Sequence, residues 1–126
     1  MEIYDVLLDI KSKLETIPDA KSVKIGLEVG IGSKDCPFIR IVSGMDTAKG
    51  TTFKDLSFSV VYGFDIKNKD LELMYKKMYE MEKSIIDAIQ YKVNYGTCFF
   101  ESNTPDGDKL TNLKSAIANF NITDIQ

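Results

Sequence analysis

The stretch Leu56-Ser-Phe-Ser-Val-Val-Tyr-Gly-Phe-Asp-Ile66 carries the clearest structural pattern in this sequence of 126 residues. Apolar side chains recur at every second position from Leu56 to Ile66, and the positions between them are mostly small or polar. A period of two predicts a strand that packs one face on a core and turns the other to solvent or a partner. This pattern is typical of an antiparallel sheet covered on one side.

Four further segments are expected to join this sheet. Residues 23–31 and 91–99 alternate in the same way, residues 38–42 form a short apolar run, and residues 113–123 alternate again near the end of the chain. Residues 43–52 contain two glycines and no periodic pattern, so we expect a long loop there. Loops of this length between strands are often interaction loops.

Two helices are predicted from apolar positions that recur in steps of three and four. The first spans residues 2–15, with Asp5 and Asp9 on its solvated side, and the second begins after a cap at Asn68 or Asp70 and ends at about residue 91. The methionines of the second helix are expected to fill the core. The sequence therefore predicts a single α+β domain over residues 1–126, in the order α-β-β-β-α-β-β. Its sheet should be largely antiparallel, with both helices on one face.

The composition removes several classes of function. There is no histidine, which excludes Ser–His and Cys–His nucleophiles and histidine-ligated metal sites. The net charge is −3 and Arg40 is the single arginine, which argues against sequence-specific DNA binding. A Ser–Lys or Thr–Lys nucleophile needs no histidine, but Ser33-Lys34 and the pairing of Lys49 with Thr51 or Thr52 have no recognisable spacing. We therefore expect no enzyme activity, no metal and no cofactor.

Other features of the sequence are consistent with a cytosolic protein. Its longest uncharged stretch is far shorter than a membrane helix requires, and the first residues lack the basic-then-apolar order of a signal peptide. Cys36 and Cys98 form no CxxC pair, so two reduced thiols are expected, with an interstrand disulfide as the alternative. The Asp106-Gly-Asp108 turn begins like a calcium loop, but Leu110 stands where a third oxygen ligand belongs.

The order of these elements resembles the tail terminator, or tail completion, proteins of long-tailed bacteriophages and related head–tail joining proteins. The resemblance rests on the N-terminal amphipathic helix, the strand Pro37-Phe-Ile-Arg-Ile-Val42 leading into Ser43-Gly-Met-Asp46, the long strand from Leu56, and the long helix followed by two closing strands. It covers nearly the whole chain and involves no diagnostic residue motif. No catalytic or metal-binding residue is implied.

The resemblance implies a structural virion protein that is assembled in the host cytoplasm and sits at the head-proximal end of the tail. Copies of the chain would form a ring, usually six-fold, that caps the tail tube, ends its growth and docks the head–tail connector protein. DNA would pass through the lumen without specific binding, and no membrane is involved. Such a ring closes when one surface of each subunit binds a different surface of the next.

Candidate interface residues come from the polar face of the long strand and from two expected loops. Met45 is included because an apolar side chain in a loop has no evident partner within the chain. The set is Met45, Asp46, Lys49, Thr51, Ser57, Ser59, Val61, Asp106 and Lys109. The alternative function is a small cytosolic domain that binds a peptide or ligand, or acts as a chaperone. A domain of that kind should contain a deep apolar pocket.

Overall fold

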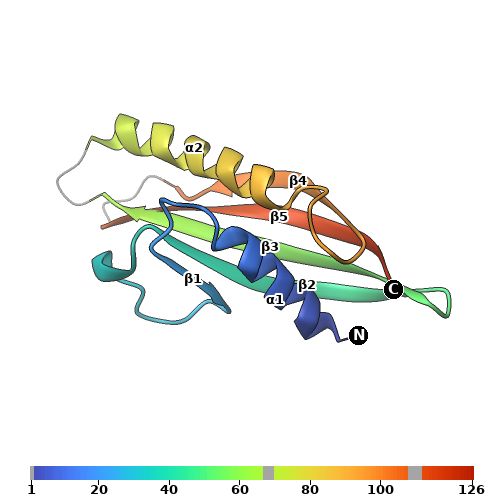
Figure 1. Ribbon diagram of the computed structural model, residues 1–126. Helices are drawn as coiled ribbons and strands as arrows, with labels where there is room; N and C mark the ends of the chain where they lie inside the picture. The colour runs from blue at the N-terminus through green and yellow to red at the C-terminus, as the bar shows by residue number, and fades with distance from the viewer. Residues whose placement is uncertain (1, 67–69, 108–111) are drawn as a thin grey trace.

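A computed structural model describes residues 2–66, 70–107 and 112–126 (Figure 1). The elements are α1 (Ile3–Leu14), β1 (Ser22–Ile25), a 3-10 turn η1 (Ser33–Asp35), β2 (Phe38–Lys49), β3 (Phe53–Asp65), α2 (Leu71–Ile89), β4 (Thr97–Pro105) and β5 (Leu113–Ile125). The predicted α+β class and element order are confirmed. Figure 1 also shows both helices on the same face of the sheet, as expected.

The five strands form one mixed sheet in the order β1-β2-β3-β5-β4. β1 pairs with β2 in parallel, and the other three pairings are antiparallel. The core lies between the sheet and the helices, and its centre is the buried row of β3 that begins at Leu56. Phe58 stacks on Phe120 of β5 with ring centroids 5.4 Å apart, and Phe100 of β4 meets the edge of Phe120 at 5.5 Å.

Both helices pack on this core through the faces that the sequence predicts. α2 buries Met74, Met78 and Met81, which confirms that these methionines fill the core. Asp70 caps the helix by accepting a hydrogen bond from the Glu72 amide, while the other suggested cap, Asn68, lies outside the described residues.

One expectation about α1 is wrong. Asp9 is buried rather than solvated, because its carboxylate accepts hydrogen bonds from the backbone and side-chain amides of Asn94 at 2.7 and 2.8 Å. A buried carboxylate needs such donors, and here they tie α1 to the loop after α2.

The strand boundaries require three further corrections. β1 ends at Ile25 rather than Ile31, because Gly26 adopts φ +92° and turns the chain away from the sheet. Residues 43–49 are not a loop: β2 continues to Lys49 and pairs with β3 through a tight turn at residues 50–52. β4 starts at Thr97, not residue 91, and continues to Pro105.

Candidate assembly interface

The face of the sheet opposite the helices, called the open face below, carries residues of four strands in transverse rows. In one row Val61 of β3 lies opposite Ile117 of β5, and in the next Ser59 lies opposite Asn119. The Ser59 hydroxyl donates to Asn119 Oδ1 at 2.7 Å, and Asn119 Nδ2 donates to Ser102 Oγ of β4 at 3.1 Å. The predicted residues Ser57, Ser59 and Val61 therefore share one surface with an exposed apolar residue, Ile117.

Two of the predicted interface residues contact each other at a β-bulge. The register of β2 against β3 shifts between Ser43 and Asp46. At this point the Met45 amide donates a hydrogen bond to Ser57 Oγ at 3.0 Å. Gly44 is required there, because a Cβ would lie 2.6 Å from Ser57 Oγ and 2.7 Å from the Ser57 carbonyl oxygen. The bulge leaves Met45 73% exposed on a strand, so its environment differs from the expected loop although its exposure fits a partner contact.

The charged residues of the β2–β3 hairpin pair within the chain. Lys49 lies 2.8 Å from Asp124 at the end of β5, and Lys54 lies 3.6 Å from Asp46. The hydrogen bond to Asp124 raises the pKa of Lys49, which keeps this ammonium protonated and unsuited to act as a general base. Thr51 is exposed in the turn. Ion pairs this exposed contribute little to stability. The side chains of Asp46 and Lys49 are themselves exposed, so both remain accessible to a partner.

Asp106 has an intramolecular role that the sequence did not indicate. Its carboxylate accepts hydrogen bonds from Lys114 Nζ at 2.6 Å and from the Ser115 amide at 2.8 Å. Lys114 is 2% exposed and lies over the Tyr75 ring at 4.5 Å, so Asp106 balances a buried charge. Lys109, the remaining predicted residue, lies outside the described part of the chain.

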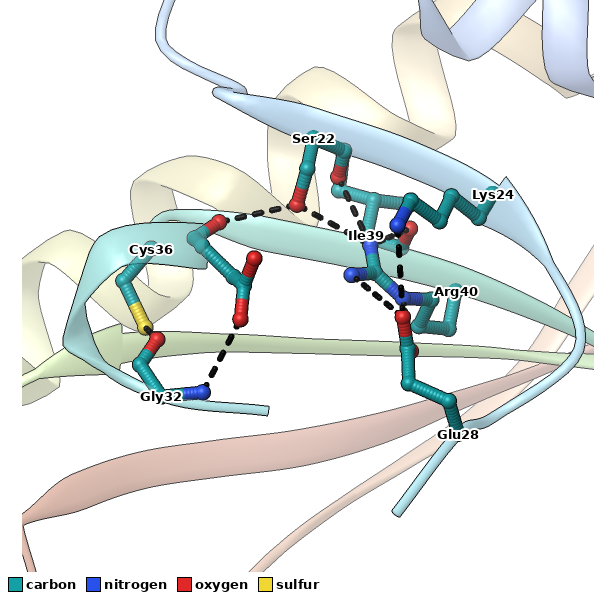
Figure 2. A network of polar contacts seen from close by, with 8 residues as sticks. Ser22, Lys24, Glu28, Gly32, Cys36, Ile39 and Arg40 are labelled. Carbon is teal, nitrogen blue, oxygen red and sulfur yellow. Dashed lines mark hydrogen bonds and ion pairs between the residues drawn. The ribbon is translucent and has the colours of Figure 1, made fainter. Parts of the chain in front are cut away.

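The single arginine is the centre of a polar network that the sequence analysis missed. Arg40 lies on the open side of β2 and is fully buried, with Nε 2.5 Å from Glu28 Oε1 and Nη2 3.2 Å from Glu28 Oε2. Its Nη1 donates to Ser22 O, Ser22 Oγ and Ile39 O, each at 3.0 Å. Figure 2 shows the Glu28 carboxylate turned toward the guanidinium and Ser22 on the other side of it.

This network anchors the segment between β1 and β2 to the edge of the open face. Hydrogen bonding to Arg40 lowers the pKa of Glu28 to about 2, so the pair is fully charged at neutral pH. A bidentate contact also fixes the direction of both side chains. A possible signal in the sequence was the charged Arg40 within the apolar run 38–42, since such a residue requires a partner when buried.

The two thiols are both free in this structure. Burial raises the pKa of Cys98 to about 12, and burial is also the main cause of the raised pKa of Cys36. Within residues 2–66, 70–107 and 112–126, no group of three or more Cys, Asp or Glu residues is arranged to hold a metal ion. No described helix is long and apolar enough to cross a membrane.

The clefts of the described surface are open to solvent. One of about 340 Å³ lies between α2 and the end of β3, where Phe64 and Met81 are joined by Asp19, Lys77 and Glu80. Another of about 520 Å³ lies between residues 31–33 and the start of β5. Neither is the deep apolar pocket that a ligand-binding domain should contain.

Comparison with known proteins gives a structural similarity and no match at the level of sequence. No protein-family model matches the sequence, and no curated protein matches it either. Among solved structures, the chain is similar to one from a structure described as "Virion of native gene transfer agent (GTA) particle". The TM-score is 0.52 at 12% sequence identity, over 98% of this chain and 92% of the other. At this identity the similarity shows a shared fold that extends over nearly the whole of both chains.

Proposed function

We propose that this chain is a structural protein of a phage-like virion, and more specifically a tail terminator. The observation that carries the proposal is the fold match to a chain of a gene transfer agent virion, which extends over 98% of this chain. That match agrees with the resemblance to tail terminators drawn from the order of elements. In this role the protein forms a ring, with six copies as the expected number, that caps the tube and joins it to the connector.

The open face and the β2–β3 hairpin supply the surfaces for ring assembly. Val61 and Ile117 provide an apolar centre between polar side chains, and Met45 adds an exposed apolar side chain beside the hairpin. Apolar centres with polar surroundings are characteristic of protein interfaces. A ring needs two different surfaces on each subunit, and these two regions are the candidates.

The electrostatics suit a lumen through which DNA passes without being held. The net charge is −3, and the single arginine is buried and paired with Glu28, so no arginine is free to grip phosphate groups. We propose a role without catalysis, supported by a composition that lacks histidine. The proposed location is the head-proximal end of the tail, after assembly in the host cytoplasm.

The proposal is tested with the tube protein from the same particle. Tube subunits are polymerised with and without this protein, and tube lengths are measured by electron microscopy while light scattering gives the mass of the free protein. We expect shorter tubes capped at one end and a particle the size of a ring, either alone or on the tube. A protein that stays monomeric and leaves the length distribution unchanged would overturn the proposal.

A Met45→Asp variant and a matched Leu73→Asp variant on α2 separate interface effects from general effects of added charge. Both residues are exposed, at 73% and 43%, so neither change should unfold the chain. We expect the first variant to cap tubes poorly and the second to cap them normally.

A further inference from the structure

Residues 27–31 have the pattern of a strand but lie outside the sheet. Leu27, Val29 and Ile31 alternate with Glu28 and Gly30, continuing the alternation of β1. The structure leaves Leu27 55% and Val29 101% exposed. Alternating apolar residues are typical of a strand with one covered face. Residues 27–31 therefore have the side-chain pattern of a paired strand, but in the described part of the chain they pair with no strand.

The outer edge of β2 has the complementary property. β1 covers β2 only from Phe38 to Ile41, and the last bond on that side runs from the Gly26 amide to the Ile41 carbonyl oxygen. Beyond it, residues 43–49 have no strand on that edge in the described part of the chain. Unpaired edges are sites where another strand adds through its backbone.

The start of the opposite edge strand, β4, is capped in a way that the β2 edge is not. The Cys98 carbonyl oxygen accepts from the Tyr91 amide at 2.8 Å, and the Phe100 amide donates to Gln90 Oε1 at 3.0 Å. The chain therefore occupies the start of β4 with its own residues. Residues 43–49 of β2 have no such contact on their outer edge in the described part of the chain, so a further strand can reach them.

Local geometry holds residues 27–31 away from the β2 edge of their own chain. Gly26 turns the backbone with φ +92°, and residues 29–30 form a turn with Gly30 at φ +84°, so strand addition requires this turn to open. Between them Glu28 is bound to Arg40 on the open side of the sheet. The strand-patterned segment and the free edge are thus both presented outward, and every copy of the chain carries both.

We propose that residues 27–31 of one copy add as a strand to the outer edge of β2, residues 43–49, of a second copy. This inference rests on the proposed function, in which copies of the chain assemble. Donor and acceptor are different surfaces, so the contact is heterologous and can propagate around a ring. Backbone hydrogen bonds supply the attachment, and the exposed Met45 is the large apolar side chain of this edge against which Leu27 or Val29 can pack.

The test mixes two chains, each with one accessible engineered cysteine, in the presence of tube protein. Val29→Cys and Thr47→Cys are each made with Cys36→Ser and carry tags of different size, so that only contact between chains yields a mixed dimer on oxidation. We expect this dimer to form. The control replaces Thr47→Cys by Lys76→Cys, which is exposed on α2 and should not cross-link to Val29→Cys. Native Cys98 is fully buried in both chains.

A second variant measures the strength of the contact. Val29→Asp should leave folding unchanged, because Val29 is fully exposed in the single chain, and should raise the concentration for half assembly by about tenfold. Leu73→Asp is the control and should not alter it. Unchanged assembly of Val29→Asp would contradict the inference.

The possible outcomes separate the inference from the proposed function. If rings form without the mixed dimer, the inference fails and the ring function stands. A further chain that carries both Val29→Cys and Thr47→Cys tests contact within one chain. If cross-linking occurs only within this chain, residues 27–31 close on their own β2 and the inference again fails. If the protein associates with neither itself nor the tube, both proposals fall.

Discussion

The two faces of β5 should separate stability from assembly. Phe120 is 1% exposed and contacts the rings of Phe58 and Phe100, whereas Ile117 on the opposite face is 42% exposed. Phe→Ala changes in a core cost about 3–5 kcal/mol, and the loss of two ring contacts places Phe120→Ala near the upper half of that range, about 4–5 kcal/mol. Ile117→Ala should change the free energy of unfolding by less than about 0.5 kcal/mol.

Urea unfolding followed by far-ultraviolet circular dichroism measures this difference. A domain of this length has a free energy of unfolding of roughly 6–19 kcal/mol, so Phe120→Ala removes a large share of it. With a urea slope of about 2 kcal/mol per molar, the midpoint should fall by about 2 M. The Ile117→Ala midpoint should stay within about 0.3 M of the unmodified protein.

Ring assembly, in contrast to stability, should be sensitive to a change at the exposed Ile117. Ile117→Asp keeps the fold and places a charge beside Val61 at the apolar centre of the open face, so we expect it to weaken ring formation in light scattering. If Phe120→Ala unfolds at the same urea concentration as Ile117→Ala, the assignment of the core face is wrong. If Ile117→Asp assembles like the unmodified protein at every concentration, the open face is not an interface.

Three further predictions concern single positions. Arg40 lowers the pKa of Glu28 to about 2, so the stabilising effect of the ionised carboxylate is present above pH 4.5 and lost as the pH falls toward 2. The urea midpoint of Glu28→Gln should therefore lie below that of the unmodified protein at pH 7, and the two midpoints should converge in acid. A difference between the midpoints that does not change with pH would contradict this. Gly96→Ala should destabilise by about 2 kcal/mol or more in thermal unfolding, because φ is +68° and a Cβ would clash with the Thr123 carbonyl oxygen; an unchanged melting temperature would refute the clash. Cys98 should react with a thiol reagent only on unfolding, since it is buried and its pKa is raised to about 12; rapid labelling of the native protein would show that the core is open there.

The elements that the sequence predicts well are those whose own side chains determine them. β3 buries every second residue and α2 buries its three-four stripe, so periodicity alone identifies both the element and its buried face. The open-face positions Ser57, Ser59 and Val61 follow from the same alternation. Their location was therefore predictable, whereas their role in assembly stays a prediction.

Contacts between distant residues were not accessible to the same reasoning. Glu28 reaches Arg40 only because Gly26 turns the chain, and Asp106 receives Lys114 only because β4 and β5 are paired. In both cases the retrospective signal is a charged residue at a position where the strand should be apolar. Such a residue indicates that a partner exists without identifying it.

The two misassigned segments show why pairing is the harder part to predict. Residues 43–49 are small or polar apart from Met45 and show no alternation, yet they form a strand because β3 lies beside them and the turn at 50–52 joins the two. Residues 27–31 alternate clearly, yet they form none in the single chain, where Gly26 turns the backbone away from the outer edge of β2. Strand formation depends on a neighbouring backbone as much as on the pattern of side chains. A clear pattern without a neighbour is thus informative in itself: it directs attention to a partner outside the chain, and residues 43–49 of another copy present the free edge that such a segment requires.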